Sequence, residues 1–387
     1  MNRSDLNQSY AAFDQASTIV CVIELSSKSW LLAGTVPGVK RQPKKKLSTN
    51  EHDLVAQIER WRAEAVKAGQ AIKRIVVAFE AGRDGAWLAR FLRDRGIEAY
   101  VIHAASIPVP REHKRAKTDR LDTEMLMRAL LGWLRGEARH CRMAQIPTLE
   151  QEDAKRPTRE HESLVGGRTR LVNRMKSTLV MLGITNFNIK LIKAGQKLAG
   201  LRTPNGEPIP PNTLEELYRG LERLAVVRKQ IKAIEQAQLR RLKAKPEAGT
   251  NPLILLIAKI RGVGIETAEM LVQEVLTRNL RDHRAVGRYG GLTGSPDESG
   301  NSRREQGLAK AGNRRVRRGM LQLAWRWLMH QKDSALTQWY RERTADGRGD
   351  TRKTMIVALA RKILIALWRY VTTGELPAGV VLKPAAI

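Results

Sequence analysis

Short apolar runs that favour β-strands alternate with segments of helical periodicity in the first third of this 387-residue chain. The β-branched run STIVCVIEL (17–25) predicts a strand, and SWLLAGTV (29–36) follows closely enough to pair with it as a hairpin. Further strands are predicted at 72–80 and 97–104, with helices at 51–69, at 86–96, and from AKTDRLD (116–122) to about residue 135. The basic stretch 36–48 is expected to form turns. This alternation predicts a mixed α/β sheet.

The rest of the chain has the pattern of helices. Residues 164–183 and 213–244 are charged, with heptad-like apolar spacing, and predict long helices that pair within the chain or between chains. From residue 251 onward the pattern indicates a mostly helical block with a glycine-rich hairpin and a polar loop. We therefore expect an α/β plus α protein with three domains: an α/β domain at 1–145, a coiled-coil-like helical dimerisation region at 146–250, and a mostly helical domain at 251–387.

Composition points to a nucleic-acid partner. The chain has 69 Lys and Arg residues against 39 Asp and Glu, a formal charge of +30, yet 42% of its residues are hydrophobic. That apolar fraction is enough for a packed core, so the charge belongs to a folded protein and not to a disordered basic tail. The commonest partner of such a field is a nucleic-acid backbone.

Other classes fit less well. No apolar run approaches the roughly 18 residues that span a bilayer, so no membrane association is expected. The first residues lack the apolar core of a signal peptide. Cys21 and Cys141 are the only cysteines, which excludes a disulfide framework and a cysteine-rich zinc site, and both are expected to be small apolar residues. We expect a cytoplasmic, nucleoid-associated protein.

Four carboxylates stand out in this basic chain. Glu24 and Glu80 each come at the end of an apolar strand, where α/β sheets place their sites. Asp119 and Asp122 are spaced i and i+3, so a helix places them on one face. Each also has a structural explanation: a strand-edge residue facing solvent, or acids that complement the positive end of a helix.

Together the four acids suggest a metal site. Mg²⁺, or Mn²⁺ in its place, prefers oxygen ligands and leaves positions open for phosphate, and two such ions can stabilise both the attacking and the leaving oxygen of a phosphodiester. The basic residues around AKTDRLD, Lys117 among them, would hold the nucleic-acid backbone beside the acids.

The C-terminal third contains two further candidate sites. KIRGVGIETAEMLVQEV (259–275) reads as a helix-hairpin-helix, in which Gly262, Gly264 and Thr267 grip one phosphate through backbone N–H groups; a plain turn between core helices is the alternative. A flexible Ser/Gly loop follows, and then a dense set of cations. The members singled out as nucleic-acid contacts are Arg303, Arg304, Lys310, Arg314 and Arg315.

These motifs resemble a known family. VIELSSKSWLLA, VVAFEAGRDG and KRAKTDRLDTEML are similar to the three acidic motifs of the DEDD transposases, insertion-sequence recombinases related to Piv-type DNA invertases. GGLTGSPDESGNS and the following KAGN resemble the C-terminal transposase region of the same family. The resemblance covers about three quarters of the chain, and the helical middle matches only in character.

The resemblance implies a RuvC-like (ribonuclease H type) domain at 1–145 with metal ligands Glu24, Glu80, Asp119 and Asp122, where Glu24 replaces the family's Asp. It implies a serine nucleophile at Ser299, with Ser302 as the fallback. It also implies homodimers or tetramers with composite active sites, donor and target DNA as substrates, and a guide (bridge) RNA. The basic stretch 40–46 would contact phosphates.

Two other functions stay open. In a junction-resolving nuclease the acids would hydrolyse DNA with water and the serine loop would be structural. In a catalytically inactive scaffold only nucleic-acid binding would remain. Among the other residues, His113 is expected to be a solvated cation. Four tryptophans are expected to anchor helix packing and not to stack on bases: Trp325, Trp327, Trp339 and Trp368.

Overall fold

A computed structural model describes residues 13–82, 85–107, 119–137, 140–299, 302–309 and 311–384. The chain divides into two compact units, with the boundary between Glu152 and Asp153. The helical middle therefore shares a unit with the C-terminal block, and the boundaries of the three predicted domains stay predictions.

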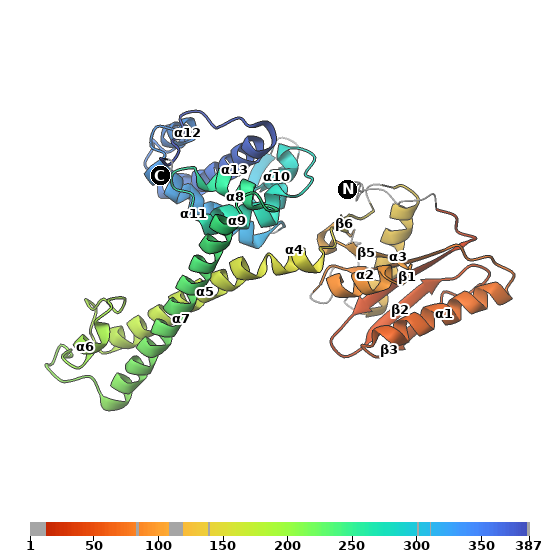
Figure 1. The fold of residues 1–387 in the computed structure, drawn as a ribbon, viewed down its shortest axis with the longest axis horizontal. Coiled ribbons are helices and arrows are strands. Elements are labelled where there is room, and N and C mark those ends of the chain that lie inside the picture. Colours follow the sequence, from red (N-terminus) through yellow and green to blue (C-terminus); the bar gives the residue numbers. More distant parts are fainter. Residues whose placement is uncertain are drawn as a thin grey trace. The chain divides into compact units, whose positions relative to one another are not determined.

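The N-terminal unit is a mixed sheet covered by helices on both faces (Figure 1). The order of its six strands is β3-β2-β1-β4-β5-β6, in which β1, β4 and β5 run parallel and the remaining pairings are antiparallel. This mixed sheet confirms the α/β class and is consistent with a ribonuclease H type fold. Its elements are β1 (Thr18–Leu25), β2 (Trp30–Thr35), β3 (Lys44–Leu47), α1 (Glu51–Lys67), β4 (Arg74–Glu80), α2 (Gly85–Arg93), β5 (Glu98–Ile102), a 3₁₀ turn (Ala104–Ser106), α3 (Asp119–Leu134), β6 (Met143–Ala144) and α4 (Leu149–Asp153).

Alternation along β1 divides the unit into two cores. Ile19, Cys21 and Ile23 belong to the cluster packed by α1 and α2, whereas Val20 and Val22 belong to the cluster packed by α3. Successive side chains of a strand point to opposite faces. Odd-numbered residues of β1 therefore face α1 and α2, and even-numbered residues face α3.

The predicted β1–β2 hairpin is confirmed, but the expectation of turns throughout 36–48 is wrong. Lys44–Leu47 forms β3, which pairs antiparallel with β2 at the edge of the sheet. Three consecutive lysines obscured the strand, because they break the apolar alternation. Lysines are common on edge strands, where their charge prevents further strand pairing.

The C-terminal unit is helical apart from one β-hairpin. Its elements are α5 (Arg156–Met181), α6 (Ala194–Leu198), α7 (Pro211–Ala244), α8 (Asn251–Ala258), α9 (Ile265–Leu271), a π-helical segment (Val272–Leu276), α10 (His283–Tyr289), β7 (Gly294–Ser299), β8 (Ser302–Leu308), α11 (Arg314–His330), α12 (Ala335–Arg343) and α13 (Gly349–Thr373).

Helices α5 and α7 pack side by side and project from the other helices of this unit, with α6 near the far end of the pair (Figure 1). A small apolar cluster holds the far end, and includes Met175, Leu179, Leu217 and Leu224. The two predicted long helices therefore pair within the chain; a contact between chains stays a prediction.

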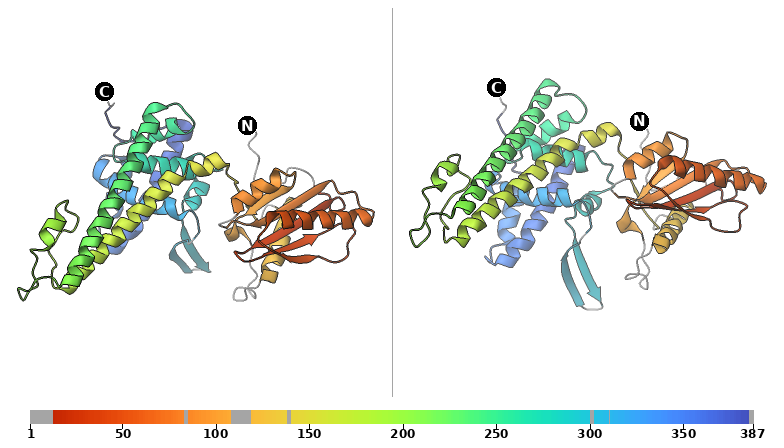
Figure 2. Two further views of the ribbon diagram at one scale, coloured as in Figure 1. Left: turned by 60° about the horizontal axis from the view of Figure 1, so that its bottom comes forward. Right: turned by 90° about the horizontal axis from the view of Figure 1, so that it is seen from below.

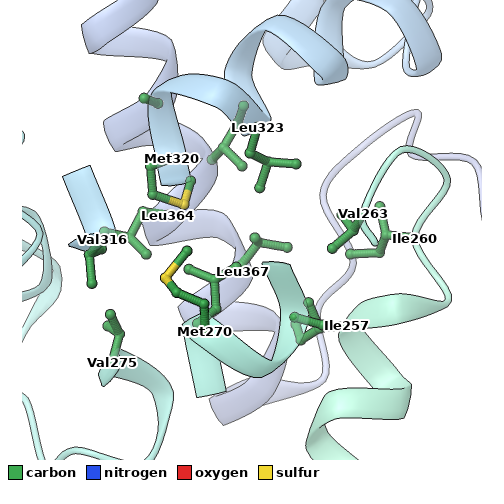
Figure 3. Packing of buried hydrophobic residues seen from close by; sticks show 14 of the residues in the cluster. Ile257, Ile260, Val263, Met270, Val275, Val316, Met320, Leu323, Leu364 and Leu367 are labelled. Atoms are coloured by element: carbon green, nitrogen blue, oxygen red, sulfur yellow. The ribbon is translucent and has the colours of Figure 1, made fainter. Parts of the chain in front are cut away.

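The main core of this unit joins residues far apart in the sequence. Met270, Met320 and Leu367, from α9, α11 and α13, are buried in one cluster (Figure 3). This core fixes where the glycine-rich turn after α8 and the helices around it stand.

Candidate functional site

Glu24 and Glu80 lie at the carboxyl ends of neighbouring parallel strands. β1 and β4 pair from Thr18↔Arg74 to Ile23↔Phe79, and the same offset places Glu24 beside Glu80 one residue further. Paired strands lie about 4.8 Å apart, so the two Cα atoms are neighbours. Glu80 is exposed and Glu24 is half-buried.

Helix α3 covers the sheet face to which both glutamates belong by parity. Leu126 and Trp133 of α3 pack with Val20, Val22, Val76 and Ala78 on the even-numbered face of β1 and β4. Asp122 stands one turn before Leu126 and is half-buried, and Thr123 beside it is 0% exposed. The side chains of Asp119 and Lys117 lie outside the described residues. Asp119 is the first residue of α3 and precedes Asp122 by one turn.

Two contacts give the direction in which α3 runs on the sheet. Thr35, paired with Val20 near the start of β1, donates its hydroxyl to the Met127 sulfur at 3.7 Å. Lys44, whose β2 partner Ala33 pairs with Val22, forms an ion pair with Glu124 at 2.7 Å. Going from residue 127 to 124 thus leads towards the carboxyl end of β1. The amino end of α3 therefore points towards the edge that bears Glu24 and Glu80.

The four acids are brought to one end of the sheet, but the described side chains do not close around an ion. Among the described residues, no three or more His, Cys, Asp or Glu side chains are grouped closely enough to hold a metal. The side chain of Asp119 is outside that set, so a full four-carboxylate site stays a prediction.

Ser299 lies on a β-hairpin and not in a flexible loop, so the predicted loop is wrong. β7 and β8 pair antiparallel, and Ser299 pairs with Ser302 at the end of the ladder nearest the turn. The hairpin projects from the helices of its unit in both views of Figure 2. Gly, Ser and Pro in β7 disfavour strands in isolation, and the cross-strand pairing outweighs that propensity.

The register of the hairpin also places opposite charges across from each other. Asp297 pairs with Arg304, and Glu298 with Arg303. Opposite charges on facing positions contribute roughly 0.2–1 kcal/mol to an antiparallel pair. The side chains of these four residues are outside the described part, so the predicted phosphate contacts of Arg303 and Arg304 stay predictions.

The next cations begin α11. Arg315 forms an ion pair with Glu162 of α5 at 3.2 Å, and Arg318 shares the same carboxylate at 2.5 Å. Arg314 is exposed, and Lys310 lies outside the described residues. The sequence did not reveal the role of Glu162, because nothing in its own segment marks it as a partner of α11.

The predicted glycine-rich turn between two helices is present between α8 and α9. Gly262 has φ +91°, which other residues rarely adopt, and a Cβ there would meet His330 at 3.0 Å. Gly264 is the N-cap of α9 and offers no capping side chain. The Thr267 hydroxyl accepts a 2.6 Å hydrogen bond from Arg326 of α11. The phosphate contact of this turn stays a prediction.

The segment that follows α13 is joined to this turn by hydrogen bonds. The Gln331 amide nitrogen donates to the carbonyls of Arg261 and Val381, at 2.7 and 2.9 Å, and its oxygen accepts from the Val381 N–H at 2.8 Å. The Lys383 ammonium donates to the carbonyls of Ala258 and Val263, at 2.6 and 2.7 Å, and burial lowers its pKa. These partners are far apart in the sequence, and no local pattern could have identified them.

The KAGN segment has a structural role. Asn313 is the N-cap of α11, and its side chain accepts from the Arg315 and Val316 N–H groups. The same side chain donates to Glu274 at 3.1 Å. Gly312 has φ +91°, and a Cβ there would lie 2.6 Å from the Arg288 carbonyl. The Gly-Asn pair therefore holds α10 and α11 in close approach.

The expectations for other residues have mixed outcomes. Cys21 and Cys141 are buried, as predicted, and burial raises the pKa of Cys21 to about 12. Trp327 is 0% exposed, also as predicted, but Trp325 is 51% exposed, so a core role for Trp325 is wrong. Residues two apart on a helix face different ways, so only one of this pair can enter the core. His113 lies outside the described residues.

Comparisons with known sequences show which proteins the chain is similar to. A profile described as "Transposase", built on DEDD transposases of the IS110 type, matches residues 38–183. A second profile, described as "Transposase IS116/IS110/IS902 family", matches residues 255–341. The chain is also 38% identical over 373 residues to a protein named "Putative transposase y4rJ" from Sinorhizobium fredii (strain NBRC 101917 / NGR234), with 93% of each chain covered. No helix in the described ranges is both long and apolar enough to cross a membrane.

Proposed function

Because this chain belongs to the transposase IS116/IS110/IS902 family, we propose that it is a site-specific DNA recombinase that cuts and rejoins a donor and a target DNA by phosphodiester transesterification. The observation that carries this proposal is the adjacency of Glu24 and Glu80 at two strand ends, on the face covered by the helix that bears Asp119 and Asp122. The net charge of +30 supports tight binding of a polyanion.

The donor set suits a hard divalent cation. Carboxylates are the ligands that Mg²⁺ and Mn²⁺ prefer, and Glu24, Glu80, Asp119 and Asp122 would hold such an ion. When bound, it would neutralise charge on the phosphate oxygens in the transition state. These residues bring the negative charge that keeps the cation at the carboxyl edge of the sheet, and the surrounding lysines and arginines hold the DNA backbone there.

Ser299 is the proposed nucleophile. Its hydroxyl oxygen forms a bond to the phosphorus, the bond from the phosphorus to one deoxyribose oxygen breaks, and the serine proton passes to a base while the leaving oxygen takes up a proton. Attack by the freed hydroxyl of the other DNA on the serine phosphodiester reverses these changes and rejoins the strands. A position at the end of a projecting hairpin supports this role, because the hydroxyl can approach a strand held elsewhere.

A guide RNA and a second copy of the chain complete the proposal. Base pairing to a bridge RNA would select donor and target, and the basic surface would serve RNA as well as DNA. The α5–α7 pair would provide the contact between subunits of a dimer or tetramer. Sequencing the RNA that copurifies with the protein tests the first part: a non-coding transcript from DNA flanking the gene supports guidance, and only random cellular RNA contradicts it.

Two substitutions across one strand pair test the nucleophile. Ser299→Ala should abolish the covalent protein–DNA adduct, whereas Ser302→Ala, facing it across the hairpin, should retain it. Adducts are trapped on a nicked substrate and seen as a shift in a denaturing gel. An adduct that survives Ser299→Ala but not Ser302→Ala moves the nucleophile to the fallback position.

The acidic residues separate the remaining alternatives. Asp119→Asn should abolish cleavage and leave DNA binding intact, with Mg²⁺ or Mn²⁺ required for cleavage by the unaltered protein. DNA cleavage that continues in Ser299→Ala without any adduct would identify a junction-resolving nuclease. Binding without cleavage in the unaltered protein, whatever metal is supplied, would identify an inactive scaffold.

A further inference from the structure

A groove with an apolar floor and a cationic rim lies among α10, α12, α13 and the chain that follows α13. Its volume is about 460 Å³, within the range of roughly 300–1,000 Å³ typical of small-molecule sites. Leu336, Ile365 and Leu376 supply apolar lining. The motifs that led to the proposed function do not include any of these residues.

The groove is built by close packing of its walls. The Ala335 N–H donates to the Ala378 carbonyl at 3.1 Å, which ties the segment after α13 to the start of α12. Gly379 has φ +71°, and a Cβ there would lie 2.7 Å from the Asp333 carbonyl. Because glycine has no Cβ, the backbone at Gly379 can approach Asp333 this closely. The segment after α13 is therefore held against the start of α12 by backbone contacts.

Two cations and a histidine border the cavity. Lys362 and Arg369 are seven residues apart on α13, so they lie on one face about 10 Å apart along the axis. His283, the first residue of α10, also lines the cavity, and Glu375 is the one acid among the described lining residues. Within the described residues no ion pair involves Lys362 or Arg369, so no described carboxylate cancels their charge at close range.

One of these cations is pre-positioned by an aromatic ring. The Lys362 ammonium lies 4.7 Å from the centre of the Trp339 ring, and the Arg343 guanidinium lies 6.0 Å from it. A cation held over an aromatic face loses less side-chain freedom when it binds an anion. Trp339 therefore contributes to the groove through the lysine that it positions.

We propose that this groove binds one nucleotide of a single-stranded nucleic acid, with the phosphate between Lys362 and Arg369 and the base or sugar against Leu336 and Ile365. A cavity of this size admits one nucleotide and is too small for a base pair. A cationic rim beside an apolar surface is the combination by which proteins hold single strands without reading sequence. The inference goes beyond the proposed recombination, because none of these residues belongs to the proposed chemistry.

Binding of fluorescein-labelled oligothymidylate and oligouridylate to the full-length protein, measured by anisotropy over a range of salt concentrations, tests the groove. The double variant Lys362→Gln/Arg369→Gln should lower the slope of log affinity against log salt by about 0.7, because the one phosphate held between these two cations contributes about 0.7 for a single strand. The control, Arg352→Gln/Lys353→Gln, removes the same charge from the same helix outside the groove and should leave the slope unchanged.

A third variant fills the groove without changing charge. Ala335 is exposed at its edge, and Ala335→Trp should weaken binding while thermal unfolding stays as in the unaltered protein. Photocrosslinking with iodouracil-substituted strands should label peptides from α12 or α13 in the unaltered protein. A preference for one of the two strands identifies DNA or RNA as the occupant.

An equal decrease of the salt slope in both double variants would show that only the net charge of the protein matters, and would overturn the proposed nucleotide site. Crosslinks confined to other peptides would do the same. These readouts need no cleavage, so a failed groove is distinguishable from a failed recombinase.

Discussion

Gln331→Met is expected to release the C-terminal segment from the turn between α8 and α9. The Gln331 side chain is fully buried and makes three hydrogen bonds, two to Val381 and one to the Arg261 carbonyl, all between 2.7 and 2.9 Å. Methionine has a similar length but no amide. The substitution therefore removes three bonds without leaving a polar group of its own buried.

The expected loss follows from those three bonds. A neutral hydrogen bond contributes about 1 kcal/mol net, and a buried group left without a partner costs about 1–3 kcal/mol. Val381 is 44% exposed, so water can replace part of what it loses. Its carbonyl also keeps the Arg261 N–H, at 3.1 Å. We therefore expect a loss of about 2–3 kcal/mol in the stability of the C-terminal unit.

Denaturant unfolding followed by hydrogen exchange measures this effect. Exchange should accelerate at the Arg261 and Lys383 amides, which donate to Val381 and Lys259 across the same junction. The control is Gln338→Met, because Gln338 is exposed and donates one bond of 3.3 Å to Lys332; its cost should stay below about 0.5 kcal/mol. If the two variants unfold alike and exchange at Arg261 is unchanged, the argument is refuted.

Three further outcomes are expected. Arg241→Met should destabilise the C-terminal unit by about 3–5 kcal/mol, because it leaves the fully buried Glu269 carboxylate without its cation. A free energy of unfolding within about 1 kcal/mol of that of the unaltered protein would contradict this. At Glu98 burial opposes the charged form, but hydrogen bonds from Arg74 prevail and lower its pKa, so this stabilisation is present above pH 4.5 and lost as pH falls through the lowered value. Glu98→Gln should cost about 1 kcal/mol at neutral pH and flatten the acid limb of stability against pH; an unchanged limb would argue against the pair. Cys21, with its pKa raised to about 12 by burial, should resist alkylation until the protein unfolds, and its contribution to stability, full below pH 9.0, is lost as pH rises towards 12; native-state labelling seen by mass spectrometry would contradict its burial.

The element types of the N-terminal unit could be predicted because local signals agree there. Apolar β-branched runs specified β1 and β4, and helix periodicity with glycine stops specified α1 and α2. β3 was missed because an edge strand buries little and its lysines carry no apolar alternation. The β7–β8 hairpin was missed for a related reason, since its residues are poor strand formers individually.

The candidate site likewise has features that the sequence predicts and features that depend on tertiary packing. The residue types and order of the four acids were visible in the sequence, because each follows a recognisable strand or opens a helix. Their grouping was a hypothesis from the strand ends and the resemblance; which acids become neighbours depends on the parallel pairing of β1 with β4 and on the direction of α3 across the sheet. The ion pairs of Arg315 with Glu162, and of Arg241 with Glu269, depend on packing between segments distant in the chain.

The amino-acid sequence by itself determined the long helices, the buried strands β1 and β4, the strongly basic charge and the chemistry of the candidate ligands. These are properties of single residues and of their near neighbours. Only the tertiary structure decided that Glu24 stands beside Glu80, that the segment after α13 closes on the glycine-rich turn, and that Lys362 and Arg369 border one groove. Those relations arise from burial and hydrogen bonding between residues up to 125 positions apart, such as Lys383 with Ala258, and no local pattern encodes them.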